Sequence, residues 1–261
     1  MIIPPLAGIC FSGIIGLLLG SFVTMASYRL PRGEELIFRR SHCPLCNHTL
    51  GVKDLFPCLS WMMSGGRCRY CHGRIHYRYL LTEIAVALLC MAAYWHAGFT
   101  ILLPILYGSI VCMSMMAIID IEYRILPDRL QLVLAGLAFL YRHYTGSSAL
   151  VILEGAALGL CVGMLLRYGY YAVRRREGLG LGDVKLLVVA GMFLDPFAFV
   201  AFLLYSGILG TVIGLVWEVV KKERLFPFGP ALCLSLLLCL LAPQWSVVML
   251  YQILGRWIDY L

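Results

Sequence analysis

The chain has 261 residues, of which 61% are hydrophobic and only 13% are charged. Soluble domains carry about 25% charged residues, so this composition excludes an ordinary soluble protein and predicts a polytopic membrane protein. The net charge of +7 does not indicate nucleic-acid binding, because the cytoplasmic loops of membrane proteins are enriched in Lys and Arg. We therefore expect contacts with membrane lipids and none with nucleic acid.

Eight apolar stretches are predicted to cross the membrane as helices, so the expected fold is all-α. The N-terminus lacks the positive region of a secretory signal, and the first stretch is therefore expected to remain in the protein. The fourth and sixth stretches are short and are expected to tilt or to lean on their neighbours. No internal repeat is evident. The stretches are 6–28, 79–97, 101–121, 130–141, 149–173, 184–194, 197–220 and 230–257.

The basic residues predict how these helices are oriented. If the N-terminus lies outside, all but three of the 21 Lys and Arg residues fall in or beside inner loops. The exceptions are Arg142, Arg167 and Arg256. Cytoplasmic loops carry the positive charge, so the sequence predicts an outer N-terminus and a cytoplasmic loop over residues 29–78.

Four cysteines in that loop have the spacing of a metal site. Cys43 and Cys46 form one Cys-x-x-Cys pair, Cys68 and Cys71 form the other, and 21 residues separate the pairs. Two such turns close a tetrahedral shell around one structural Zn²⁺ ion. Free cytosolic thiols or a redox pair are the alternatives. The loop's excess of basic residues suits anionic lipid headgroups, and a docking face for a substrate is the alternative.

Two segments place aspartates at the ends of apolar stretches on the predicted cytoplasmic side. Asp120 ends the third stretch and is followed by Leu-Pro-Asp at 126–128, while residues 178–185 read Gly-Leu-Gly-Leu-Gly-Asp-Val-Lys, with Asp183 opening the sixth. A carboxylate at a membrane boundary is costly to desolvate and is kept mainly for function. The glycines are expected to permit a sharp turn and a close approach to another segment. Helix-end residues facing interfacial water are the alternative for both aspartates.

Two aspartates that share a proton can catalyse peptide hydrolysis. The ionised carboxylate takes a proton from water while the protonated one polarises the scissile carbonyl. Asp128 is expected to cap the following helix, since Asp is a favoured N-cap residue. Lys185 is a neighbour that can tune the charge, although a solvated helix end is the simpler role. Neither His-Glu-x-x-His nor Gly-x-Ser-x-Gly occurs in the chain.

These motifs resemble the type IV prepilin leader peptidase family of GxGD intramembrane aspartyl proteases. Further matching text is Gly-Ser-Phe at 20–22, Arg-Leu-Pro at 29–31, both cysteine pairs with their neighbours, Ser-Trp at 60–61, Tyr79 with Glu83, and Pro-Phe-Gly-Pro at 227–230. Thr24 departs from the Asn that the family usually carries. The family's first catalytic aspartate precedes Leu-Pro-Asp by the interval seen here, so the resemblance assigns catalysis to Asp120 and Asp183. Supporting roles fall to Asp128, Lys185, Gly180 and Gly182.

The resemblance implies an aspartic endopeptidase of the bacterial inner membrane, with its active site at the cytoplasmic face. It would remove the leader of type IV prepilins or type II secretion pseudopilins after a Gly. It would then N-methylate the new N-terminal residue, usually Phe, with S-adenosylmethionine as cofactor. The expected organisation is a first transmembrane helix at 1–28, a zinc-binding loop domain at 29–78 and a transmembrane protease core at 79–261.

Two other functions fit parts of the sequence. A proton- or cation-coupled transporter would also hold carboxylates in helices, but it should place them near the midplane and show inverted repeats. A non-catalytic scaffold that docks partners through a zinc ribbon would explain the cysteines and leave both aspartate motifs without a role.

Overall fold

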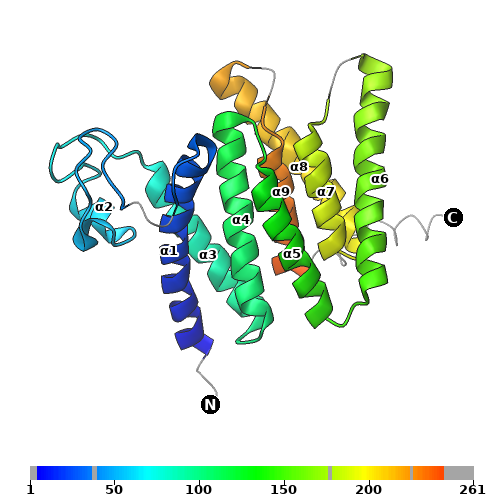
Figure 1. The fold of residues 1–261 in the computed structure, drawn as a ribbon, viewed down its shortest axis with the longest axis horizontal. Coiled ribbons are helices and arrows are strands. Elements are labelled where there is room, and N and C mark those ends of the chain that lie inside the picture. The colour runs from blue at the N-terminus through cyan, green and yellow to red at the C-terminus, as the bar shows by residue number, and fades with distance from the viewer. Residues whose placement is uncertain (1–4, 37–39, 176–177, 224–225, 244–261) are drawn as a thin grey trace. The chain divides into compact units, whose positions relative to one another are not determined.

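The computed structural model describes residues 5–36, 40–175, 178–223 and 226–243 (Figure 1). Within these ranges the chain is helical and contains two isolated β-bridges but no strand. The predicted all-α fold is therefore confirmed.

The chain forms two compact units, Met1–Met115 and Met116–Leu261. The first contains α1 (Pro5–Arg29), α3 (Arg78–Ala97), the first part of α4 (Leu102–Tyr123) and the segment between α1 and α3, with short 3-10 helices at Leu30–Arg32 and Val52–Asp54 and the five-residue α2 (Leu59–Met63). The second contains the end of α4, α5 (Asp128–Tyr144), α6 (Ala149–Arg174), α7 (Leu181–Phe193), α8 (Pro196–Lys221) and α9 (Gly229–Leu241).

A helix forms at each of the eight predicted stretches, and within the described residues five of these helices are long and apolar enough to span a membrane. These five are Leu6–Arg32, Arg78–Ala97, Leu102–Tyr123, Ala149–Val173 and Pro196–Lys221. Helix α7 has 13 residues, about 20 Å at 1.5 Å per residue, which is less than the ~30 Å hydrocarbon core. The last predicted stretch begins as α9, and its part from 244 to 257 lies outside the described residues. The chain is a multi-pass membrane protein with helices of unequal length.

Glycines bring α1 and α3 into close contact in the first unit. A Cβ atom on Gly16 would lie 2.5 Å from the Cα of Ala87, and one on Gly20 would lie 2.6 Å from the Cα of Glu83. Real Cβ atoms do not approach that closely, so only glycine allows this packing. Small residues four apart are the usual way for membrane helices to bring their backbones together.

A second glycine face joins α6 to α7. Cβ atoms on Gly155 and Gly159 would lie 2.1 and 2.3 Å from the carbonyl oxygens of Gly191 and Leu187 in α7. One turn further on, a Cβ atom on Gly163 would lie 3.0 Å from Cγ1 of Val184. The three glycines repeat every four residues and therefore share one face of the helix. This face fixes the position of α7, and with it Asp183.

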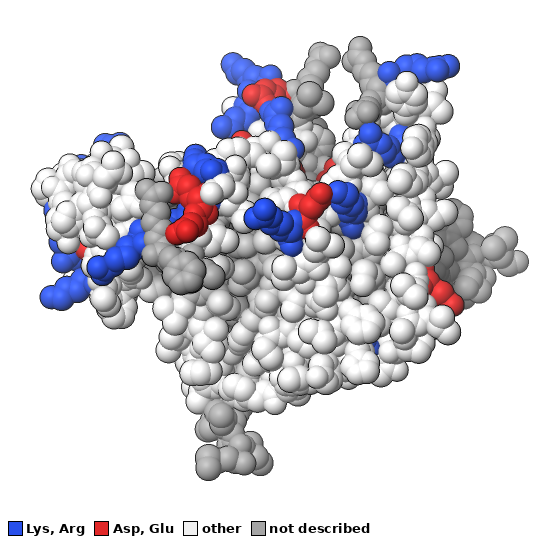
Figure 2. All heavy atoms as spheres, viewed as in Figure 1, with Lys and Arg blue, Asp and Glu red and all other residues white. Residues whose placement is uncertain are grey.

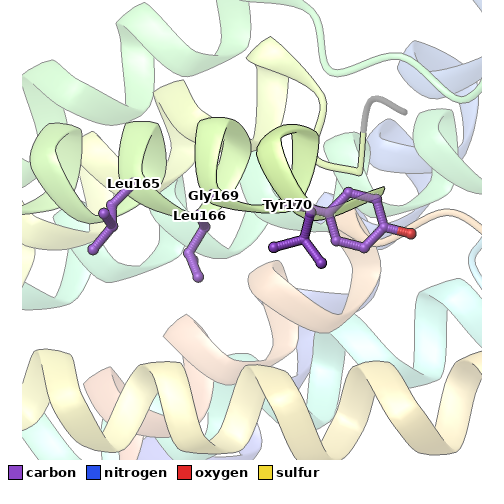
Figure 3. Close-up of a pocket in the computed structure, with 5 residues that line it drawn as sticks. Leu165, Leu166, Gly169 and Tyr170 are labelled. Atoms are coloured by element: carbon purple, nitrogen blue, oxygen red, sulfur yellow. The ribbon is translucent and has the colours of Figure 1, made fainter. Parts of the chain in front are cut away.

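Beyond these glycines, toward the C-terminal end of α6, larger apolar side chains replace them. Figure 3 shows Leu165, Leu166, Gly169 and Tyr170 lining an open depression of about 390 Å³. Its lining is almost entirely apolar. Such a surface suits contact with lipid tails in a multi-pass membrane protein.

Basic residues gather at one end of the second unit. The α4–α5, α6–α7 and α8–α9 connections all lie at this end, at the top of the unit in Figure 1. Figure 2 shows several groups of Lys and Arg side chains there, with a few Asp and Glu side chains among them. The residues that directly follow α4, α6 and α8 are Arg124, Arg175 and Lys222, with φ angles of 56°, 53° and 55°. Three basic residues therefore occupy the left-handed conformation in which glycine is usual.

Candidate active site and metal site

Asp120 lies in the last turn of α4, where the apolar run of that helix ends. The left-handed Arg124 donates its N–H to the Asp120 carbonyl oxygen at 2.9 Å and terminates the helix. Pro127 then enforces an extended connection to α5. The Asp120 residue is only 6% exposed.

The Asp120 carboxylate is held by the start of α9. The Gly229 N–H donates to Oδ2 of Asp120 at 2.9 Å, and a helix N-terminus favours negative charge. A Cβ at Gly229 would lie 2.7 Å from that oxygen and 3.0 Å from Leu126 Cδ2, so a side chain there would displace the carboxylate. In the sequence, Pro-Phe-Gly-Pro at 227–230 is a pattern that matches the family, and Gly229 was not predicted to belong to the site. A glycine and a proline opening an apolar helix were the available signal.

Asp183 lies in the first turn of α7 and is half-buried. Its Oδ2 accepts the N–H of Gly180, the N-cap residue, at 3.2 Å. Gly180 has a φ of −66°, so this turn needs no left-handed residue. The predicted close approach is present instead, because a Cβ at Gly182 would lie 3.1 Å from Leu126 Cβ. Glycine is used at this position for space.

The structure brings the two aspartates together although 62 residues separate them in sequence. The two carboxylates are near enough for a negative charge on Asp120 to disfavour a negative charge on Asp183. Both also act on Cys233, a buried residue one turn into α9. Two carboxylates that repel each other do not easily ionise together, which favours one protonated and one ionised group. The pair can therefore supply one acid and one base to a hydrolysis.

Asp128 and Lys185 lie beside the pair and bond to each other. Lys185 Nζ donates to Asp128 Oδ1 at 2.6 Å, and both side chains are exposed, so the ion pair contributes at most about 1 kcal/mol. The prediction that Asp128 caps α5 is wrong, because the preceding Pro127 is the N-cap and Asp128 is the first helical residue. A proline fits that place because its fixed φ and missing N–H cost a helix start nothing.

A buried glutamine, which the sequence analysis did not identify, joins the two aspartate motifs. Gln131 Nε2 donates to the carbonyl oxygen of Gly182 at 3.1 Å and to that of Leu126 at 3.5 Å. Gln131 is 4% exposed. Its position on the inner face of α5 could not be inferred without knowing which helix α5 contacts.

The four predicted cysteines also come together. Their Sγ atoms all lie within 4.8 Å of one another, and those of Cys43 and Cys71 are 3.9 Å apart. A tetrahedral ion with metal–sulfur bonds of about 2.3 Å needs sulfur atoms roughly 3.8 Å apart, so the set is close to the required size. The cluster can hold a metal ion. Cys58 and the loop histidines are not in it.

The two cysteine pairs form a structural repeat with an offset of 25 residues, which the sequence analysis did not detect. Cys43 N–H donates to the His48 carbonyl at 2.9 Å, and Cys68 N–H donates to that of Gly73 at 2.8 Å. Isolated bridges pair His42 with Thr49 and Arg67 with Arg74. Asn47 and His72 turn with φ of 56° and 55°. The two segments share few residues besides the cysteines. The repeat is therefore visible in the backbone conformation and not in the sequence.

The loop lowers the cost of forming a thiolate at one of the four cysteines, Cys68, whereas the pKa of the Cys71 thiol is raised to about 11. Backbone N–H groups of Cys71 and Tyr70 point at the Cys68 sulfur and lower the pKa of that thiol to about 7. Thiolate is the form that binds a metal.

Comparison with known proteins gives the family. Residues 14–97, which include the four cysteines, match the bacterial peptidase A24 N-terminal domain, and residues 107–215, which include both aspartates, match the type IV leader peptidase family. A prepilin leader peptidase/N-methyltransferase of Pectobacterium carotovorum is 31% identical over 85% of this chain and 89% of its own length. The chain belongs to the type IV leader peptidase family.

Other members of this family have a similar level of sequence identity to the chain. A type 4 prepilin-like proteins leader peptide-processing enzyme of Escherichia coli is 32% identical over 85% of this chain and 88% of its own. A prepilin leader peptidase/N-methyltransferase of Pseudomonas aeruginosa is 29% identical over 88% and 89%. No solved structure matches this leader peptidase chain.

Proposed function

We propose that this protein is an intramembrane aspartyl endopeptidase that removes the leader from type IV prepilins or type II secretion pseudopilins. Its second activity would be N-methylation of the new N-terminal residue. The observation that carries the peptidase assignment is the meeting of Asp120 and Asp183, one held by the Gly229 N–H and the other by the Gly180 N–H. Family membership supports this function over a transporter or a scaffold.

The chemistry follows from the paired carboxylates. The ionised aspartate takes a proton from water, and the water oxygen bonds to the scissile carbonyl carbon. The protonated aspartate donates to the carbonyl oxygen, and the later break of the C–N bond returns a proton to the leaving amine. The Gly229 and Gly180 N–H groups keep the two carboxylates in place during this cycle.

The active site would lie at the cytoplasmic face of the bacterial inner membrane. The end of the second unit that carries Asp128 and Lys185 also carries the unit's basic loops, and cytoplasmic loops are the basic ones. With this orientation the N-terminus is outside. A substrate with a basic leader in the cytoplasm and an apolar helix in lipid would present its cleavage site at this level.

We expect the metal at the four cysteines to be a structural Zn²⁺ ion. A closed shell of four thiolates leaves no position for water, and such sites contribute much of the folding energy of a small segment.

Chelation, or Cys68→Ser, should remove about one equivalent of zinc and make residues 40–77 sensitive to protease. Metal analysis with limited proteolysis measures both. Cys161→Ser, at an exposed cysteine in α6, is the control and should keep the zinc. Full protease resistance after zinc loss would contradict a structural role.

The same unit offers a place for the methyl donor, S-adenosylmethionine, which supplies the methyl group. An open depression of about 530 Å³ is lined by Trp61 and Tyr77 together with Arg67 and Arg74. Aromatic rings can stack on an adenine, and an arginine can pair with the carboxylate of the methionyl part. These residues therefore fit the chemical groups of the cofactor.

The proposed function is tested with purified protein, a prepilin peptide and mass spectrometry. We expect a product that begins after the leader's last Gly and, with S-adenosylmethionine present, a further product heavier by one methyl group. An intact peptide after prolonged incubation with the zinc-loaded enzyme would contradict the proposal. Cleavage without methylation would restrict it to the peptidase.

A further inference from the structure

A buried carboxylate in the first unit has no role in the chemistry described above. Glu83 lies in the second turn of α3, is 7% exposed, and packs its backbone against Gly20 of α1. Removing a carboxylate from water is costly unless a cation or several hydrogen bonds compensate. An ionisable residue in a membrane helix is therefore a candidate functional group.

The described groups around Glu83 are the two hydrogen-bond donors of Cys58, its N–H and its neutral thiol, and they include no cation. The Cys58 N–H donates to Glu83 Oε2 at 2.7 Å, with Cys58 at a φ of 58° that is strained for a residue with a side chain. Burial, together with the nearby Glu83, raises the pKa of the Cys58 thiol to about 11, so this thiol is neutral at pH 7. Within the described part of the chain, no Lys or Arg forms an ion pair with Glu83. Buried Arg29 donates to the carbonyl oxygens of Glu35 and Arg40.

We propose that the Glu83 carboxylate binds an organic ammonium ion, namely the α-ammonium group of the cleaved substrate during methyl transfer. This inference rests on the proposed methyltransferase function. An ammonium group offers three N–H donors to a carboxylate, whereas the sulfonium centre of the methyl donor offers none. The α-ammonium of the methyl donor has the same chemistry, and the experiment separates the two sources.

The test measures binding to the full-length, zinc-loaded protein in detergent. The probes are a peptide with the sequence of the cleaved product, the same peptide with an acetylated N-terminus, and S-adenosylmethionine. Wild type should bind the free amine at least about tenfold more tightly than the acetylated one, as expected for a hydrogen-bonded charge. Glu83→Gln keeps an oxygen for the Cys58 N–H but removes the charge. It should bind both peptides equally, retain leader cleavage and zinc, and lose methylation at least about tenfold.

Glu154→Gln, at an exposed carboxylate in α6, is the matched control and should behave as wild type. Equal binding of the two peptides by wild type would overturn the inference whatever the variants do. A Glu83→Gln protein that still prefers the free amine would also overturn it, as would one that loses only the affinity for S-adenosylmethionine. Wild type that prefers the free amine but never methylates it would contradict the proposed methyltransferase function and leave the amine site standing.

Discussion

Asp120→Asn and Asp183→Asn should each lower the rate of leader cleavage by about 10²- to 10⁴-fold, the usual contribution of a general acid or base. Asn keeps the size of the side chain and can still accept the Gly229 or Gly180 N–H, but it cannot cycle a proton. Because the two carboxylates act as one unit, the double variant should be barely slower than either single variant. The rate is measured by mass spectrometry of the prepilin peptide.

Asp128→Asn is the matched control for this experiment. It removes the ion pair with Lys185, an exposed contact worth at most about 1 kcal/mol, and cleavage should change by only a few-fold. Zinc content and elution volume should be the same in all variants. Cleavage that persists in Asp120→Asn while Asp128→Asn is inactive would move the catalytic role to Asp128. Cleavage in all three would exclude an aspartyl mechanism.

Gly155→Ala and Gly159→Ala should strongly destabilise the second unit. The added Cβ would lie 2.1 or 2.3 Å from a carbonyl oxygen of α7, and a backbone cannot move aside as a flexible side chain can. Overpacking typically costs about 1–3 kcal/mol and occasionally more, and we expect the upper end here. The thermal midpoint of unfolding in detergent measures the effect. Cleavage should fall as well, because α7 carries Asp183.

Gly169→Ala lies in the same helix and gives the opposite expectation. Nothing lies within 4 Å of a Cβ at that position, and Ala is favoured over Gly inside a helix by about 1 kcal/mol. The thermal midpoint should therefore stay the same or rise slightly. Equal midpoints for Gly159→Ala and Gly169→Ala would mean that the close approach of α6 and α7 is not required.

Apolar runs were sufficient to predict the helices, because backbone groups in a membrane must bond within their own segment. The boundaries of α6 and α8 agree with their predicted stretches to within one residue. The glycine face of α6 was also visible as Gly-x-x-x-Gly-x-x-x-Gly, a signal that the sequence analysis did not use. The contact of this face with Gly191 of α7 could not be predicted, because the spacing of residues within one helix does not identify the neighbouring helix.

The candidate site was predicted in part. The four cysteines were predicted from their Cys-x-x-Cys spacing, and the structure gathers their sulfur atoms. Asp120 and Asp183 were singled out by their place at the ends of apolar stretches and by the resemblance, and their catalytic roles stay predictions. Gly229 was missed because it contributes a backbone N–H, which every residue except proline has. The contact between Cys58 and Glu83 depends on a positive φ at a cysteine, which no sequence rule favours.

The basic residues that directly follow α4, α6 and α8 show a conflict between local conformation and membrane topology. A left-handed residue with a side chain costs roughly 1–2 kcal/mol, and glycine would avoid that cost. Arg124, Arg175 and Lys222 nevertheless place positive charge at the negative end of each helix dipole. In the orientation proposed above they also lie on the cytoplasmic side, where basic residues direct membrane insertion. Replacing them with glycine would make each helix end easier to form but weaken the signal that directs the chain's insertion. A chain selected only for stability in detergent would therefore tend to lose the information that orients it during synthesis.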